Sequence, residues 1–163
     1  MIAACLITKD SEATLAMALA SIRPHVDGIF IYDTGSTDGT FDLIGRLNSE
    51  QGPSVCAACG TPAVDEKHGC GCHAPDDPEN RPELILVPLA PIVVERGEWR
   101  DDFSWAREQS FTMPPDEYEW LLWLDDDDEV QGAHQLRAMA ATAPPELDGY
   151  IAHYDYARTP DGT

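Results

Sequence analysis

Basic residues are scarce in this chain of 163 residues: lysine and arginine together number 10, against 30 aspartates and glutamates, and the formal net charge is -20. A surface of that charge repels phosphate backbones and anionic lipids, so we expect neither nucleic acid nor an anionic membrane as a partner. Long apolar runs are lacking too, and no basic stretch precedes an apolar segment at the N-terminus. The sequence therefore predicts no membrane span and no secretory signal, and we expect a cytoplasmic protein.

The residues that are present have a globular composition, with 43% hydrophobic and 8% aromatic residues. A chain of this length can bury one hydrophobic core, which favours a single domain over residues 1–163.

Short apolar runs alternate with helical patterns along most of the chain. Strands are predicted over residues 2–7, 28–33, 83–89, 120–124 and 149–156; helices are predicted from a cap at Ser11 to Pro24, from a cap at Ser36 or Thr37 through Leu47, over 103–111, and over 131–141. The segment between 89 and 103 is interpreted as an acidic loop. Alternating strands and helices with apolar strands indicate a three-layer α/β fold with a mostly parallel sheet. Such sheets bind ligands beyond the carboxyl ends of their strands, where Asp33 and Asp125 stand.

The stretch WLLWLDDDDEV at residues 120–130 places five consecutive carboxylates after an apolar strand. Neighbouring carboxylates repel by about 1 kcal/mol in water and about 4 kcal/mol at an effective dielectric of 20, so a partly buried cluster calls for a compensating cation or helix N-terminus. An EF-hand is excluded, because Val130 and Leu136 occupy its glycine and glutamate positions.

Three interpretations of the acidic stretch remain. The acids could cap the following helix and complement its dipole. Asp126, Asp128 and Val130 also fit the D-x-D-x-V pattern of haloacid-dehalogenase-like phosphatases, although few residues follow for the other motifs of that fold. Lastly, Asp125 and Asp127 form a D-x-D pair which, in an extended chain, would lie on one side and hold Mg²⁺ or Mn²⁺ with positions open for phosphate oxygens.

Taken together, four segments resemble the family-2 glycosyltransferases, which have the Rossmann-like nucleotide-diphospho-sugar transferase fold called glycosyltransferase fold A. The segments are CLITKD at 5–10, IYDTGSTDGT at 31–40, FSWARE at 103–108 and LLWLDDDDE at 121–129. Asp10 and Ser11 depart from the asparagine and glutamate common in that family. The resemblance implies a donor-binding domain for a nucleoside-diphosphate sugar, with a UDP-sugar favoured and the acceptor unknown.

The resemblance also implies residue roles. Thr8 and Asp33 would line the base pocket, with Asp33 accepting hydrogen bonds from the base, and Arg107 would lie against the base or the diphosphate. Asp127 would hold the metal, while Asp125 or Asp126 would contact the ribose or bind the metal through water. For Arg107 the alternative is a salt bridge to a nearby acid.

Two smaller expectations concern backbone and catalysis. Gly35 permits close approach of the backbone to a ligand, or makes an ordinary turn. A catalytic base for an inverting transfer is not identified, because nothing in the spacing supports Asp155. A non-catalytic module that binds a nucleotide sugar or a partner is therefore the alternative to an enzyme.

Residues 48–83 break the α/β pattern with prolines, cysteines and no apolar period, which predicts an insertion. The spacing of Cys56, Cys59, Cys70 and Cys72 favours a structural zinc site, in which His68 or His73 could replace one thiolate. Disulfides or free cysteines are the alternative. Cys5, alone in an apolar strand, is expected to be a packing residue.

Overall fold

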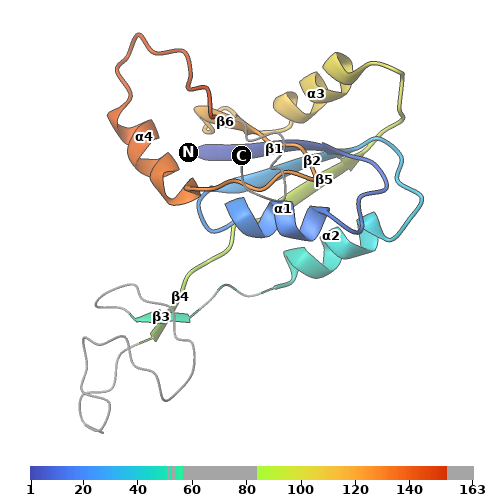
Figure 1. The fold of residues 1–163 in the computed structure, drawn as a ribbon, viewed down its shortest axis with the longest axis horizontal. Helices are drawn as coiled ribbons and strands as arrows, with labels where there is room; N and C mark the ends of the chain where they lie inside the picture. Colours follow the sequence, from blue (N-terminus) through green and yellow to red (C-terminus); the bar gives the residue numbers. More distant parts are fainter. Residues whose placement is uncertain (51, 53, 57–83, 154–163) are drawn as a thin grey trace, which may run out of the picture.

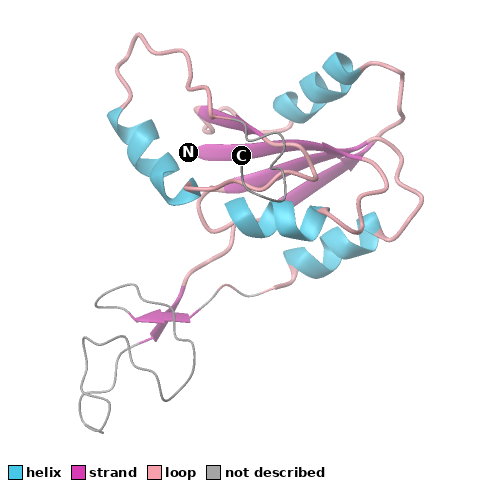
Figure 2. Ribbon diagram, viewed as in Figure 1, coloured by secondary structure: helices cyan, strands magenta, loops and turns pink. Residues whose placement is uncertain are grey.

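The structure is a computed structural model that describes residues 1–50, 52, 54–56 and 84–153. Figures 1 and 2 show an α/β fold in which helices cover both faces of a sheet. The elements in chain order are β1 (Ile2–Thr8), α1 (Leu15–Ile22), β2 (Gly28–Asp33), α2 (Thr40–Asn48), β3 (Ser54–Cys56), β4 (Leu84–Leu86), β5 (Ile92–Arg96), α3 (Phe103–Thr112), β6 (Trp120–Trp123), the 3₁₀ turn η1 (Ala133–Gln135) and α4 (Leu136–Thr142). The main sheet has four strands in the order β5-β2-β1-β6, and every pairing is parallel. The predicted α/β class with a parallel sheet is confirmed at this level.

The two central strands are apolar up to their last residues, Thr8 and Asp33, as expected for strands buried on both faces. Alternate residues of β1 serve opposite faces: Ile2, Ala4 and Leu6 join the core under α1 and α2, whereas Ala3 and Cys5 join a smaller core next to α3. Burial raises the pKa of the Cys5 thiol to about 12, so this cysteine is an inert packing residue, as expected.

The helices next to the central strands begin later than the sequence suggested. The backbone carbonyl of Ser11 accepts hydrogen bonds in the turn before α1, but its side chain does not cap that helix. At α2 the carboxylate of Asp38 accepts from the backbone N–H of Thr40 at 3.0 Å. The predicted caps at Ser11 and at Ser36 or Thr37 are therefore wrong, because the side chains of Ser11 and Ser36 hydrogen-bond across neighbouring loops instead.

The third predicted strand is misplaced. The apolar run at 83–89 contributes only β4, which pairs antiparallel with β3 in a separate two-stranded sheet. The fourth strand of the main sheet is β5, in a segment interpreted from the sequence as an acidic loop. As an edge strand β5 buries little beyond Ile92 and leaves Glu95 and Arg96 exposed, so it lacks the continuous apolar run of a central strand.

The helix predicted over 131–141 is present as η1 followed by α4. The strand predicted over 149–156 is not found in its described part, since residues 149–153 have no regular structure, and residues 154–156 lie outside the described range. The predicted insertion starts within α2, which continues to Asn48. Across the described ranges, no helix combines the length and apolar character needed to cross a bilayer.

Candidate functional site

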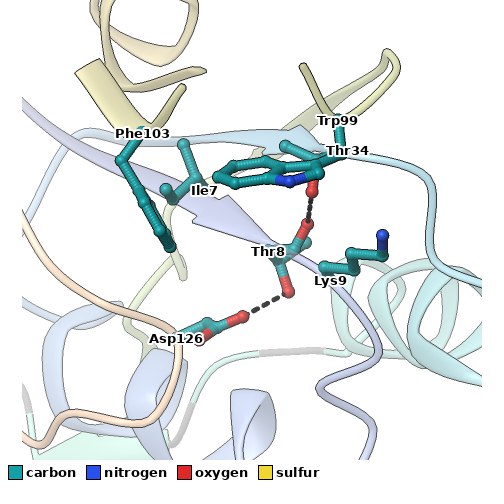
Figure 3. A pocket seen from close by; sticks show the side chains of 7 residues that line it. All are labelled: Ile7, Thr8, Lys9, Thr34, Trp99, Phe103 and Asp126. Atoms are coloured by element: carbon teal, nitrogen blue, oxygen red, sulfur yellow. Dashed lines mark hydrogen bonds between the residues drawn. The ribbon is translucent and has the colours of Figure 1, made fainter. Parts of the chain in front are cut away.

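A cavity of about 280 Å³ opens at the carboxyl edge of the parallel sheet, beyond the ends of β1 and β2 (Figure 3). Seven residues line it: Ile7, Thr8, Lys9, Thr34, Trp99, Phe103 and Asp126. The location is where parallel α/β sheets generally bind ligands, because the loops that follow the strands converge there. The cavity is therefore the candidate binding site.

Hydroxyl groups and one carboxylate form the polar floor of this cavity (Figure 3). The Thr8 hydroxyl donates to Oδ2 of Asp126 at 2.7 Å, and the Ser11 hydroxyl donates to the same oxygen. Thr34 in turn donates from Oγ1 to the backbone carbonyl of Thr8 at 3.1 Å. The site thus contains Thr8 and Asp126, two of the predicted residues, held together although 118 positions separate them in the chain.

Asp33 lies behind this floor and is not part of the cavity wall. Its side chain is 0% exposed. Oδ1 accepts from the backbone N–H groups of Gly35 at 3.2 Å and Ser36 at 2.8 Å, and Oδ2 accepts from Nε of Arg96 at 3.1 Å. The carboxylate anchors the turn after β2, and both of its oxygens already accept hydrogen bonds within the protein. Its contact with a base stays a prediction.

Gly35 belongs to the turn that Asp33 anchors and has a φ of 101°, a left-handed conformation that other residues rarely adopt. It does not line the cavity. The turn therefore explains this glycine without a ligand.

Arg96 is a residue that the sequence did not single out. Its Nη2 donates to the carbonyl of Ser36 at 2.9 Å, and its guanidinium lies 4.8 Å from the ring centroid of Phe41. The available signal was the strand register: Arg96 is the direct partner of Asp33 in the β2–β5 ladder, which becomes visible only once β5 is identified.

The first carboxylate of the acidic stretch has its counter-ion within the protein. Nη2 of Arg107 is 2.7 Å from Oδ1 of Asp125, and Nε1 of Trp123 donates to the same oxygen at 2.9 Å. The Arg107 guanidinium also lies 3.2 Å from the centre of the Trp123 ring. Burial lowers the pKa of Arg107, and the adjacent carboxylate counteracts that effect. The salt bridge expected as one alternative for Arg107 is present, and its contact with a base or a diphosphate stays a prediction.

The acidic stretch does not stay extended after β6. The chain turns at Asp126 and Asp127, and the N–H of Asp128 donates to the carbonyl of Asp125 at 3.2 Å. The expectation that Asp125 and Asp127 share one side of an extended strand is therefore wrong. Asp125 points to Arg107, Asp126 binds hydroxyl groups, and Asp127 is exposed, so the like charges are spread in different directions.

The loops after β1 and β2 are joined by Asp10, one of the departures from the family pattern. Asp10 has a φ of 53°, and its Oδ1 accepts from the N–H groups of Thr37 at 2.6 Å and Asp38 at 3.2 Å. The hydrogen bond from the Thr37 N–H lowers the pKa of the Asp10 carboxyl. Asp10 thus fixes the two loops that border the cavity relative to each other.

The acidic turn is the predicted site of a divalent cation. Within the described ranges, no group of three or more histidine, cysteine, aspartate or glutamate side chains is arranged to hold a metal ion. Mg²⁺ commonly uses only one or two carboxylates and completes its shell with water and substrate phosphates. The exposed carboxylate of Asp127 is a hard oxygen ligand of that kind, whereas Asp125 points to Arg107, and metal binding by the two residues stays a prediction.

The predicted zinc site lies almost wholly outside the described residues. The backbone of Cys56 ends β3, opposite Leu84 of β4, while Cys59, Cys70 and Cys72 lie in the range 57–83 that the structure does not describe. Structural zinc stays a prediction.

Comparison with known proteins gives a distant relationship. No family model matches the chain. A TPR repeat-containing protein of Synechococcus elongatus is 25% identical to it over 126 residues, which are 77% of this chain and 20% of that protein. The chain thus spans about one fifth of the length of the curated relative it matches.

Proposed function

We propose that this chain is the donor-binding domain of a metal-dependent glycosyltransferase of family 2, with glycosyltransferase fold A, and that it takes a nucleoside-diphosphate sugar such as a UDP-sugar. One observation carries the proposal: the cavity draws one or more residues from each of the four separate segments on which the family resemblance rests. They are Thr8 and Lys9, Thr34, Phe103, and Asp126. A common donor site requires that these four segments meet, and they line one cavity.

The polar groups at this edge suit a nucleotide sugar. Asp126 presents a carboxylate that can accept hydrogen bonds from ribose hydroxyls, and its place is fixed by Thr8 and Ser11. Lys9 is exposed at the cavity, where its ammonium group can pair with a phosphate.

The transfer itself would need the diphosphate leaving group to be stabilised. A divalent cation held by Asp127 would supply Lewis-acid stabilisation of that group, which is worth several kcal/mol in such reactions. Arg107 would take part by donating hydrogen bonds from its guanidinium, which now pairs with Asp125, to the diphosphate.

Nucleotide binding tests the donor site. Isothermal titration of the chain with UDP and with GDP, in the presence and absence of Mn²⁺, should give saturable binding that strengthens with the metal. Asp127→Asn should abolish the strengthening by Mn²⁺. Glu119→Gln is the matched control, because it removes the same charge from a side chain that is 79% exposed at the opposite end of β6.

Absence of binding by both nucleotides, or an unchanged response of Asp127→Asn to Mn²⁺, would refute the donor site. A labelled UDP-sugar then separates two outcomes. Hydrolysis or transfer of the sugar identifies an enzyme, whereas tight binding without either identifies a non-catalytic nucleotide-sugar module.

A further inference from the structure

Two aromatic side chains form one wall of the cavity. Phe103 is the first residue of α3, and its side chain is 67% exposed, which leaves most of its ring open to a ligand in the cavity. Trp99, on the loop after β5, meets Phe103 edge to face with ring centroids 4.7 Å apart and planes at 69°. Figure 3 shows both rings on one side of the cavity, with Thr8 and Asp126 across from them.

This aromatic wall, Trp99 and Phe103, is held in place before any ligand arrives. Nε1 of Trp99 donates to Oδ1 of Asp101 at 2.7 Å, and Asp101 has a left-handed φ of 53°. Asp102 caps α3 by accepting from the N–H of Trp105 at 3.0 Å, which fixes the first turn that carries Phe103. Asp101 therefore orients the Trp99 ring, and Asp102 fixes the backbone from which the Phe103 ring projects.

The cavity accommodates only one end of a nucleotide sugar. Its volume of about 280 Å³ falls just below the range of roughly 300–1,000 Å³ usual for pockets that enclose a whole small ligand. Asp125, Asp127 and Arg107, which are proposed to meet the diphosphate, are not among the lining residues. The reacting sugar and the diphosphate therefore lie outside, and the base and ribose remain for the cavity.

We propose that Trp99 and Phe103 are the base-binding residues of the site, with the flat face of the nucleobase against the aromatic wall and the ribose toward Asp126. In this arrangement Lys9 lies at the end of the cavity where the ribose continues into the phosphates. This assignment rests on the proposed function and adds to it. A flat ring covers the exposed face of Phe103, and stacking tolerates any base, which places the base without requiring Asp33 to be uncovered.

The test compares UDP with inorganic pyrophosphate, which carries no base, by isothermal titration in the presence of Mn²⁺. Trp99→Ala and Phe103→Ser should each weaken UDP binding by roughly 5- to 100-fold, the range expected for a lost aromatic contact, and should leave pyrophosphate binding unchanged. Lys9→Ala should weaken both ligands. Phe103→Ser removes a largely exposed group and so tests the wall with little effect on folding.

Two further variants sharpen the result. Trp99→Phe should keep most of the affinity for UDP but lose the quenching of tryptophan fluorescence that a stacked base causes in the wild type. Tyr150→Ala is the control, because it removes an aromatic ring, 47% exposed, that stacks on Trp120 outside the cavity. It should leave UDP binding unchanged.

Each contrary outcome has a separate meaning. If the wild type binds UDP and the two wall variants bind it equally well, the base-binding assignment is overturned while the donor site stands. If they weaken a UDP-sugar but not UDP, the wall holds the sugar, and the assignment to the base is wrong. If the wild type binds neither UDP nor GDP, the proposed function and this assignment fall together.

Discussion

Two parallel strands, β2 and β6, lead to aspartates at the same edge of the sheet: Asp33 is the last residue of β2, and Asp125 follows two residues after β6. The carboxylates at these two strand ends differ in what they do. Asp33, after β2, is wholly buried, and both of its oxygens are used within the protein. The stretch from Asp125 to Glu129, after β6, is partly or fully exposed and spreads its charges in different directions. A single buried carboxylate with three internal donors stabilises a turn, whereas the carboxylates after β6 remain in contact with water.

The sharpest way to break this contrast is to remove the buried carboxylate. Asp33→Ala should lower the free energy of unfolding by about 2–4 kcal/mol, because it leaves the buried N–H of Ser36 without an acceptor and Arg96 without its ion pair. Urea denaturation would measure this loss. Asp33→Asn, which retains one acceptor oxygen, should lose less, and equal stability of the alanine variant and wild type would show that the turn does not depend on Asp33.

A smaller loss is expected at the bridging carboxylate. Asp126→Ala should cost about 1–2 kcal/mol, since the buried hydroxyl of Thr8 and that of Ser11 lose a charged acceptor while the site stays accessible to water. The same denaturation experiment measures it. The double variant with Thr8→Val should be little worse than Asp126→Ala alone, and fully additive losses would mean that the hydrogen bond between them contributes nothing.

Asp27 provides a reference carboxylate at the opposite edge of the sheet. Burial would raise its pKa, but hydrogen bonds from the Ile2 N–H and from Arg137 hold the pKa of Asp27 below its usual range. Since the folded pKa is lowered, the stabilisation is complete above the unfolded pKa of about 3.9 and is lost as the pH falls through the folded value. Asp27→Asn should cost about 1 kcal/mol near neutral pH, because Arg137 is largely exposed.

The pH series checks the sign of that effect. The stability difference between wild type and Asp27→Asn should shrink as the pH is lowered below about 4. A difference that grows in acid would contradict the lowered pKa.

The ion pair of the acidic stretch should contribute less than either of these hydrogen-bonded groups. A double-mutant cycle of Arg107→Gln and Asp125→Asn should give a coupling energy of about 0.5–1 kcal/mol, because Asp125 is 43% exposed and water screens the pair. Added salt should reduce the coupling. A coupling energy above about 3 kcal/mol would mean that this pair behaves like a buried one, as at Asp33, and would contradict the difference between the two strand ends.

The exposed carboxylate should matter least for folding. Asp127→Asn should change the free energy of unfolding by less than about 0.5 kcal/mol, and relief of repulsion among the neighbouring acids favours a small gain. Thermal melting with and without Mn²⁺ measures both stability and ligand response. A large loss without metal would show that Asp127 supports the fold, which would undo its assignment to the metal.

Much of the fold was predictable from the chain because the signals were local and strong. The apolar runs at 2–7 and 28–33 predicted β1 and β2, and FSWAREQSF predicted α3, since strands buried on both faces and helices with a clear cap have distinct patterns. The edge strand β5 was missed because its burial is decided by a neighbour 63 positions away, where Arg96 pairs with Asp33. The apolar run at 83–89 gave a stronger strand signal than β5, although it has no place in the main sheet.

The sequence by itself determined an acidic α/β protein with parallel strands and with polar segments at their carboxyl ends, because apolar runs and turn residues act over a few positions. Only the tertiary structure decided which carboxylates form hydrogen bonds and ion pairs within the protein. Asp33 became a buried anchor because β5 brings Arg96 beside it, and Asp126 entered the cavity because the chain turns after β6 toward Thr8. Such pairings depend on distances between residues far apart in the chain, and no local pattern contains that information.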